Sequence, residues 1–369
     1  MHLSMSLFLA NTILRASKGV STADHLALYS IDVVENYHHW SQSHLLIRSA
    51  VHSLAIESAF ELEMVQTAVI ESLGAIPIRS RMTSVLITGT SKGIGLQTAL
   101  TFARAGHRVY ATMRGPARSP ELAQTAAREK LPITVSAMDV DSDESVRNAV
   151  AAILKDHGPI DVLINNAGVE RSGSVEELPL ADFRAVMETN YFGVIRCIQA
   201  LVPQMRQRRS GCIINVSSVA GRITSAPLAS YAASKWALEG LSEALAGELK
   251  TFGVRVILIE PGIIDTAMAR RIGDAPSNSP YPQLARFASL FQASLKTPVP
   301  PSLVAQKILE VADSGTWQLR HLVGPDAAPF LAWRSQMTDE EWVDLYASDD
   351  ETWYRRVERD FGMDTRPKK

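Results

Sequence analysis

Short apolar runs rich in β-branched residues alternate with segments of helical periodicity from Val85 onward. This alternation is typical of βαβ units, in which helices cover both faces of a parallel sheet. Strands are expected at Val85–Thr88, Arg108–Thr112, Ile133–Ala137, Val162–Asn165, Cys212–Val216, Val254–Glu260 and His321–Val323. Helices are expected at Ile94–Ala105, Pro120–Glu129, Glu144–His157, Leu180–Arg208, Tyr231–Thr251 and Ser302–Ser314. The pattern therefore predicts an α/β fold.

Two segments do not follow this alternation of strands and helices. Residues 1–81 are rich in histidine, and only 44–73 show irregular helical spacing of apolar positions, so we assign them no fold. Because the first strand follows Met82 closely, we expect 1–81 to be an extension that is poorly ordered or not native, and a chain beginning at Met82 to fold. The alternative is a genuine partner-binding or targeting segment. Residues 276–301 combine many Pro and Ser with one apolar stretch at 284–295, which predicts a mobile flap over a site.

Composition argues against several classes of protein. Lys and Arg number 37 against 39 Asp and Glu, and this formal net charge of −2 gives no global field for nucleic acid or an anionic membrane surface. Only Cys197 and Cys212 occur, without metal-ligand spacing, so we expect neither a disulfide framework nor a metal site. No apolar run is long enough to span a bilayer, and a cytoplasmic location is the default expectation.

A glycine-rich turn follows the first expected strand. It reads Thr88-Gly89-Thr90-Ser91-Lys92-Gly93-Ile94-Gly95 and runs directly into a helix. Glycine is needed where a backbone turns tightly and approaches a pyrophosphate, and a helix N-terminus supplies amide groups and a positive dipole end. Three residues separate the first two glycines, which departs from the G-x-G-x-x-G spacing. Its place between a strand and a helix still favours dinucleotide binding.

The end of the second strand selects between the two dinucleotides. An acidic residue there binds a ribose 2′-hydroxyl, whereas a basic one accommodates a 2′-phosphate. The sequence Val109-Tyr110-Ala111-Thr112-Met113-Arg114 has no carboxylate, and Lys92 lies in the glycine-rich turn facing the same pocket. We therefore expect NADP(H). The competing interpretation is that Arg114 and Lys92 are solvated surface charges.

The stretch Ser217–Lys235 carries a hydroxyl, a phenol and an amine at spacings that can converge. Tyr231 and Lys235 lie four positions apart and share one face of a helix. A neighbouring cation favours the phenolate and lowers the phenol's pKa from its ordinary value of about 10, which makes Tyr231 a candidate general acid/base. Ser218 follows a strand, and its hydroxyl is expected to reach an oxygen shared with Tyr231. A lone Tyr-x-x-x-Lys is common in helices, so the surrounding motifs carry the interpretation.

These motifs, in this order, resemble those of the short-chain dehydrogenases/reductases. The resemblance covers about Thr83–Val323 and includes the glycine-rich turn, Asn165-Asn166-Ala167-Gly168, Ser218, Tyr231-x-x-x-Lys235 and Pro261-Gly262. It implies a single doubly wound Rossmann-type domain of about seven parallel strands, which binds NADP and is catalytic, at residues 82–324. A helical extension at 325–369 would follow. The family is commonly dimeric or tetrameric, so a homodimer or homotetramer is implied.

The resemblance also implies roles for single residues. Tyr231 is the acid/base, Lys235 lowers its pKa and binds the nicotinamide ribose, and Ser218 holds the substrate oxygen. Asn190 supports a water-linked proton path to the lysine. The implied cofactor contacts are Gly89, Ser91, Lys92, Gly93, Ile94, Gly95, Arg114, Asp139, Val140, Asn166, Ala167, Gly168, Tyr231, Lys235, Pro261, Gly262, Ile264 and Thr266. Asp139 and Val140 match the adenine-binding pair and Thr266 the carboxamide-binding threonine. The competing interpretations are that Asn165 and Asn166 satisfy backbone groups at a strand end and that Asp139 is a helix N-cap precursor.

The implied reaction interconverts a carbonyl and an alcohol by hydride transfer with NADP(H). Residues 109–112 and the long segment after Pro261-Gly262 are similar to the hydroxysteroid and retinol dehydrogenase branch. Tyr281, Phe287, Leu290 and Phe291 are expected to form an apolar wall suited to a lipophilic substrate. One alternative is a 3-oxoacyl carrier protein reductase, whose chains end sooner after the last strand. The other is a non-catalytic NADP(H)-sensing or scaffold protein on the same fold.

Overall fold

The computed structural model describes residues 82–274 and 278–366, so the expectations for residues 1–81 lie outside the described residues. Seven strands in the described part form one parallel sheet in the order β3-β2-β1-β4-β5-β6-β7. They are β1 (Ser84–Thr88), β2 (Arg108–Met113), β3 (Ile133–Ala137), β4 (Val162–Asn165), β5 (Gly211–Val216), β6 (Val254–Pro261) and β7 (Arg320–Val323). The predicted doubly wound α/β fold is confirmed.

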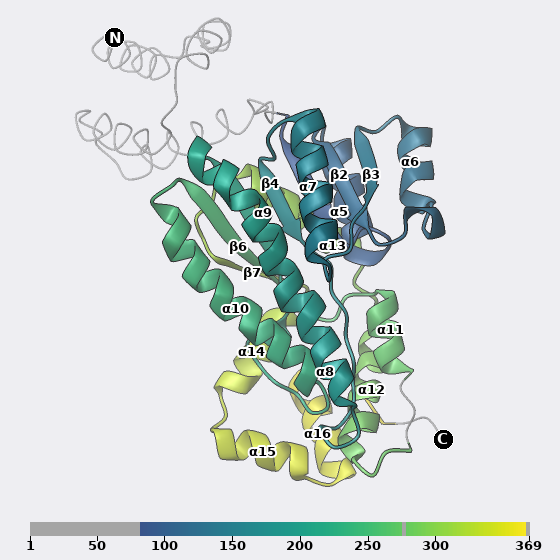
Figure 1. The fold of residues 1–369 in the computed structure, drawn as a ribbon. Coiled ribbons are helices and arrows are strands. Elements are labelled where there is room, and N and C mark those ends of the chain that lie inside the picture. The colour runs from purple at the N-terminus through teal and green to yellow at the C-terminus, as the bar shows by residue number, and fades with distance from the viewer. Residues whose placement is uncertain (1–81, 275–277, 367–369) are drawn as a thin grey trace, which may run out of the picture. The chain divides into compact units, whose positions relative to one another are not determined.

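Helices connect the strands and follow the last one (Figure 1). Those between the strands are α5 (Gly93–Arg104), α6 (Glu121–Glu129), α7 (Asp143–His157), α8 (Leu180–Met187), α9 (Gly193–Arg208), α10 (Ala229–Lys250), α11 (Ala267–Gly273), α12 (Pro282–Ser294) and α13 (Pro301–Asp313). Three more follow β7: α14 (Ala327–Ser335), α15 (Asp339–Ala347) and α16 (Asp350–Phe361). Short helical turns η2 (Pro116–Arg118), η3 (Glu188–Phe192) and η4 (Val219–Gly221) complete the set.

The sheet has a separate apolar core on each face, because successive strand residues point to opposite sides. On β1, Val85 and Ile87 pack with α5 and α13 on one face, whereas Leu86 packs with α7, α9 and α10 on the other. A third cluster of buried apolar residues joins α11 and α12 to α14–α16. The first two clusters fix the sheet and the third closes one end of the site described below.

Chain order reverses between β1 and β4, which are neighbours in the sheet. In open parallel sheets this switch point leaves a crevice outside the carboxyl ends of the strands, where ligands bind. The glycine-rich turn follows β1, and Asn166 to Gly168 follow β4, so both motifs lie at the crevice. The topology therefore brings together residues that are 78 and 79 positions apart in sequence.

Two sequence-based expectations need correction. The single helix expected at Leu180–Arg208 is divided into α8 and α9 by η3, a π-helical turn. Such a turn holds one extra residue, so the helices before and after it present different residues to their neighbours. Asn190 is fully buried within this turn. The flap expected at 276–301 is largely helix α12, which begins with Pro282. Proline fits this first position because the first N–H groups of a helix have no intrahelical partner, so its missing N–H costs no hydrogen bond.

Candidate active site

A cavity of about 530 Å³ opens at the carboxyl ends of the strands. The glycine-rich turn and the ends of β2 and β4 line one part of it, and side chains from α11, α12 and α14–α16 line the other. Figure 1 shows α14–α16, in yellow-green, gathered below α10 together with α12. Ser218, Tyr231 and Lys235 also line the cavity. One continuous space therefore runs from a glycine-rich turn to an apolar chamber.

The glycine-rich turn is shaped by close backbone packing. Gly89 has a φ of +72°, and a Cβ there would lie 2.7 Å from Ala167 Cα. At Gly95 a Cβ would lie 2.3 Å from Asn166 Nδ2 and 2.4 Å from Gly89 O. Gly93 has a φ of +60°, which disfavours any other residue. Gly89 and Gly95 leave no room for a Cβ, and Gly93 has a left-handed backbone that favours glycine. The result is a tight turn whose backbone borders the cavity at the start of α5.

Asn166 holds this turn to the end of β4. Its side-chain Nδ2 donates to the carbonyl oxygens of Thr88 and Gly89 at 2.9 and 3.0 Å, and its backbone N–H donates to Thr88 Oγ1 at 3.0 Å. Thr88 Oγ1 also accepts from the Ala167 N–H at 2.9 Å. The amide of Asn166 is thus committed to the protein backbone, as the competing interpretation expected, although the residue also lines the cavity.

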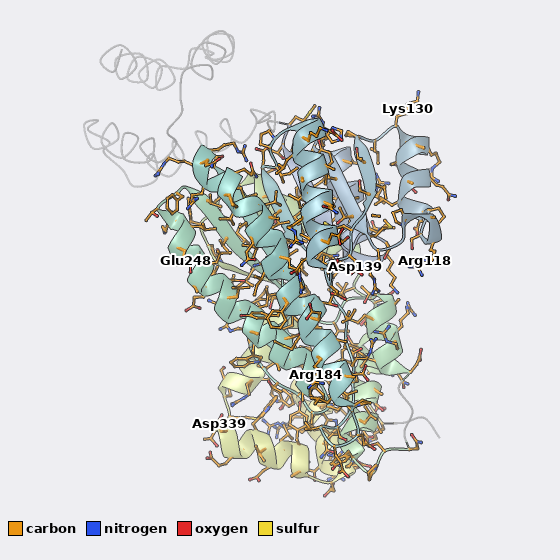
Figure 2. The ribbon with its side chains drawn as sticks, in the orientation of Figure 1. Arg118, Lys130, Asp139, Arg184, Glu248 and Asp339 are labelled. Carbon is orange, nitrogen blue, oxygen red and sulfur yellow. The ribbon has the colours of Figure 1, made fainter. Side chains whose placement is uncertain are left out.

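Basic side chains border the cavity beyond β2. Arg114 and Lys92 are exposed and Met113 is buried, and all three line the cavity. A third cation, Arg118, folds over Gly115, where a Cβ would lie 2.7 Å from its Nε. Figure 2 shows Arg118 at the lower end of the sheet block in this view, where Asp139 also lies. Asp139 forms part of the cavity wall and accepts a hydrogen bond from the Asp141 N–H at 3.2 Å.

Ser218, Tyr231 and Lys235 come from the end of β5 and the start of α10. Ser218 caps the short turn η4, accepting from the Ala220 N–H at 3.1 Å. Lys235 is 5% exposed, donates from Nζ to Val216 O at 2.8 Å, and places Nζ 5.6 Å from the centre of the Tyr231 ring. Because β5 delivers both Val216 and Ser218 to this point, the strand end positions the hydroxyl and the ammonium together.

The pKa expected for Tyr231 is wrong for the protein alone. Burial raises the pKa of Tyr231 to about 12, the Ser218 hydroxyl opposes this by hydrogen bonding, and the Glu170 carboxylate raises it further. Burial also lowers the pKa of Lys235 to about 8, with Glu239 acting in the opposite direction. Burial and the Glu170 carboxylate therefore outweigh the hydrogen bond from Ser218. Tyr231 is a protonated phenol at neutral pH.

Asn190 does not line the cavity. Its Oδ1 accepts from the Val169 N–H at 2.8 Å, and its Nδ2 donates to Val169 O and to Ser234 Oγ, both at 2.9 Å. These bonds join η3 to the strand-end loop after β4 and to α10. A Cβ at Gly168 would lie 3.4 Å from Asn190 Oδ1 and 4.0 Å from Lys235 Nζ. Asn190 thus holds the wall beside Lys235 while remaining outside the cavity itself.

Every other predicted site residue lines the cavity. These are Gly89, Ser91, Lys92, Gly93, Ile94, Gly95, Arg114, Asp139, Val140, Asn166, Ala167, Gly168, Ser218, Tyr231, Lys235, Pro261, Gly262, Ile264 and Thr266. Thr266 also caps α11, accepting from the Ala269 N–H at 3.3 Å. The described residues contain no cluster of His, Cys, Asp and Glu suited to a metal ion. Among these same residues, no helix is both long and apolar enough to cross a membrane.

Sequence reasoning missed Asp141 and Glu170, which line the cavity, and Asp326, which lies behind its wall. Glu170 lines the cavity, is 2% exposed, accepts from Ser172 Oγ and lies 3.5 Å from Arg271 Nη2. Asp326 accepts from the Ile263 N–H at 2.8 Å, and a Cβ at Gly262 would lie 2.1 Å from its Oδ1. Asp326 therefore holds the Pro261-Gly262 loop in place, although it lies 63 positions after Ile263 in the sequence. In the sequence, Asp326 is marked only by its position after the turn-forming residues Gly324-Pro325, which does not indicate its partner.

The far end of the cavity is aromatic. Phe330, Trp333, Trp342, Tyr346, Trp353 and Phe361 line it together with Phe287, Leu290 and Phe291. Trp333 stacks edge-on with Trp342 and with Trp353, at 5.2 and 6.3 Å between ring centres. Tyr281, which was expected in this wall, does not line the cavity, because its hydroxyl points to Glu176. The C-terminal helices supply most of the apolar surface that the sequence assigned to the flap.

Comparison with known proteins agrees with the family resemblance found in the sequence motifs. A family model described as short chain dehydrogenase matches residues 83–277. Oxidoreductase BOA17 of Botryotinia fuckeliana is 36% identical over 70% of this chain and 96% of its own length. Retinol dehydrogenase 8 of Bos taurus is 37% identical over 68% of this chain and 84% of its own length.

Solved structures share the fold. A short-chain dehydrogenase from Streptomyces avermitilis has a TM-score of 0.61 and 31% identity, covering 75% of this chain and 97% of that one. An actinorhodin polyketide ketoreductase with NADPH has a TM-score of 0.60 and 27% identity, covering 67% of this chain and 97% of that one. The sheet, the site geometry and the matched family model agree, and this chain is a member of the short-chain dehydrogenase/reductase family of oxidoreductases.

Proposed function

We propose that this oxidoreductase interconverts a carbonyl and an alcohol on a lipophilic substrate with NADP(H), using Tyr231 as the general acid/base. The observation that carries the proposal is the position of Ser218, Tyr231 and Lys235 on the wall of one cavity. On one side lies the tight glycine-rich turn, and on the other an aromatic chamber. A nucleotide and an apolar substrate would thus meet beside a phenol and a hydroxyl.

The residues present fit a nicotinamide dinucleotide. The close approach of Gly89 and Gly95 to neighbouring backbone and side chains leaves main-chain groups bordering the cavity at the start of α5, where a helix N-terminus favours a diphosphate. Arg114 and Lys92 are exposed cations on the cavity wall, where the proposal places the 2′-phosphate, and no carboxylate lies on the described residues at the end of β2. These features support NADP(H) over NAD(H).

Each of the three polar side chains has its own part in the proposed reaction. When bound, the nicotinamide supplies or accepts the hydride. With its pKa at about 12, Tyr231 stays protonated at neutral pH and can donate a proton to a carbonyl oxygen as that oxygen becomes an alcohol. The Ser218 hydroxyl holds the same oxygen and stabilises the charge that develops on it. The Lys235 ammonium favours the phenolate left after proton transfer.

The apolar chamber supports a lipophilic substrate. Aromatic and aliphatic side chains from α12 and α14–α16 enclose this end, which is the arrangement of sites that bury most of an apolar ligand. Two relatives, from Bos taurus and Homo sapiens, carry the name retinol dehydrogenase 8, and a third, from Bacteroides thetaiotaomicron, is a 3-ketodihydrosphingosine reductase. Both names denote chemistry on long apolar molecules, consistent with the chamber.

The proposal is tested by following NADPH oxidation with a panel of aldehydes and ketones of increasing chain length. We expect turnover that improves with apolar length and is lost in Tyr231→Phe. A matched control is Tyr191→Phe, because Tyr191 lies in η3 and is not among the cavity-lining residues. NADPH binding without turnover of any carbonyl or alcohol would refute the proposed reaction and favour a sensing or scaffold role.

A further inference from the structure

Glu170 places a buried carboxyl group in the wall of the cavity. The residue lines the cavity and is 2% exposed, so its carboxylate is largely removed from bulk water. Burying a carboxylate is costly unless hydrogen bonds and opposite charges compensate it. The partners that the protein gives Glu170 therefore show how much of this compensation is left for a ligand to supply.

The compensation of the Glu170 carboxylate is incomplete. Ser172 Oγ donates to Oε1, whereas Arg271 Nη2 lies 3.5 Å from Oε2, at the outer limit of a hydrogen bond. The Arg271 side chain is 54% exposed, so water screens its charge. A carboxylate oxygen can accept two hydrogen bonds, and in the described part of the chain this long contact is the one that Oε2 has. Oε2 can thus accept a further hydrogen bond.

The two oxygens of this carboxylate differ in their surroundings. Arg271, which contacts Oε2, lines the cavity, whereas Ser172, which binds Oε1, does not. Oε2 is therefore the oxygen on the cavity side. The weakly bonded oxygen of a buried carboxylate lies where a bound molecule can reach it.

Backbone contacts fix Glu170 beside the reacting side chains. Gly168, two residues earlier, lies close to the proposed catalytic amine, since a Cβ there would be 4.0 Å from Lys235 Nζ. Two residues span at most about 7 Å between Cα atoms. The carbonyl oxygen of the residue after Glu170 accepts from Ser230 Oγ at 2.7 Å, and Ser230 immediately precedes Tyr231. Glu170 is therefore held on a short segment that contacts α10 next to the phenol.

The electrostatics of the site agree with this position. Burial is the main cause of the raised pKa of Tyr231, and the Glu170 carboxylate adds to it, as expected of a negative charge near the phenol. A substrate whose carbonyl oxygen met Ser218 and Tyr231 would thus bring its neighbouring atoms toward Glu170.

We infer that Glu170 is a specificity-determining residue, which accepts a hydrogen bond from an amino or hydroxyl group that the substrate carries next to its reacting carbonyl. The inference rests on the proposed function, because it takes the carbonyl oxygen to lie at Ser218 and Tyr231. Since Arg271 compensates the charge of Glu170 only in part, an ammonium group should bind more tightly than a hydroxyl. The preferred substrates are then long-chain ketones with an amino or hydroxyl group on the neighbouring carbon.

The test compares three ketones that have the same long alkyl chain. The carbon next to the carbonyl carries an amino group, a hydroxyl group or only hydrogen. Turnover is measured as kcat/KM with NADPH, and binding is measured separately by quenching of tryptophan fluorescence, because Trp333, Trp342 and Trp353 line the apolar chamber. In the wild type we expect the amino and hydroxy ketones to bind and react at least about tenfold better than the plain ketone.

Three variants locate the origin of this preference. Glu170→Gln keeps the shape of the side chain and removes its charge, so the preference for the amino ketone should fall about tenfold. Glu177→Gln is the matched control and should stay within twofold of wild type, because Glu177 is an exposed carboxylate on the same loop that does not line the cavity. Arg271→Met removes the competing cation and should retain or increase the preference for the amino ketone.

A purely structural role for the Glu170–Arg271 ion pair predicts a different pattern. In that case Glu170→Gln and Arg271→Met would weaken all three ketones equally, and this result overturns the inference. A wild-type preference below about twofold, or one that Glu170→Gln leaves unchanged, overturns it as well. Should Glu170→Gln fail to fold, Arg271→Met decides, since a lost preference for the amino ketone there contradicts the inference. Binding that shows the Glu170-dependent preference without turnover of any ketone supports the inference and refutes only the proposed reaction.

Discussion

The proposed preference for NADP(H) is attributed to two exposed cations, and their removal gives a measurable prediction. Lys92 and Arg114 approach the cavity from different elements, the turn before α5 and the end of β2. A hydrogen bond to a charged group contributes about 1.5 to 3 kcal/mol, and solvent screening of exposed side chains favours the lower value. At about 1.5 kcal/mol, each substitution to alanine should lower the preference for NADPH over NADH about tenfold.

The double substitution tests whether both cations hold one phosphate. Two independent contacts would give a loss of about a hundredfold, whereas cations that share a single 2′-phosphate would give less than the sum. The assay is kcat/KM with NADPH and with NADH, repeated at high salt, where screening should reduce the wild-type preference. Arg108→Ala is the control, since Arg108 is an exposed cation at the opposite end of β2. A preference that stays within twofold of the wild-type value in the double variant would refute the assignment of Lys92 and Arg114 to the 2′-phosphate.

Three further predictions concern the acid, the turn and the C-terminal helices. Tyr231→Phe should retain cofactor binding and lose at least about a hundredfold in turnover. Because burial raises the pKa of Tyr231 to about 12, alcohol oxidation, which needs the phenolate, should rise with pH by up to about tenfold per unit between pH 7 and 9; a flat oxidation profile contradicts this role. Gly95→Ala should abolish nucleotide binding measured by NADPH fluorescence, since its Cβ would lie 2.3 Å from Asn166 Nδ2, and retained binding would show that the turn can relax. Arg286→Met should lower the free energy of unfolding, measured in urea, by about 1 to 3 kcal/mol. Arg286 is 3% exposed, and its guanidinium donates to two carbonyl groups and to a carboxylate near α16. The control Arg355→Met removes a side chain that is 73% exposed and should change this free energy by less than about 0.5 kcal/mol.

The sequence predicted local features better than those that depend on distant residues. Each strand lies within one residue of its expected bounds at either end, because buried parallel strands are continuous β-branched runs between polar turns. The division of the long helix at η3 was missed, since a π-helical turn leaves the apolar composition unchanged and alters only its phase. Spacing alone also placed Tyr231 beside Lys235 correctly, as the 5.6 Å separation of ring centre and Nζ shows.

The pattern of apolar and polar positions does not predict pKa values or contacts between residues that are distant in sequence. The sequence contains the cation beside Tyr231 but carries no measure of the burial that raises the phenol's pKa. Glu170 meets Arg271 across 101 positions, and Asp326 meets Ile263 across 63, so neither contact has a local signature. These residues were found only when the fold brought α11 and the segment after β7 against the carboxyl ends of the strands.

The cavity's two ends come from different stretches of the polypeptide. The glycine-rich turn, the basic border and the strand-end loop after β4 are all supplied before residue 170, whereas the aromatic chamber comes mainly from α12 and α14–α16, after residue 280. Evolution can therefore exchange the C-terminal helices for others, through gene fusion or gradual drift, and alter which molecules are accepted while the nucleotide half stays intact. Grafting another homologue's segments that correspond to α12 and α14–α16, while keeping α13 and β7 in the core of the sheet, is the corresponding route for engineering.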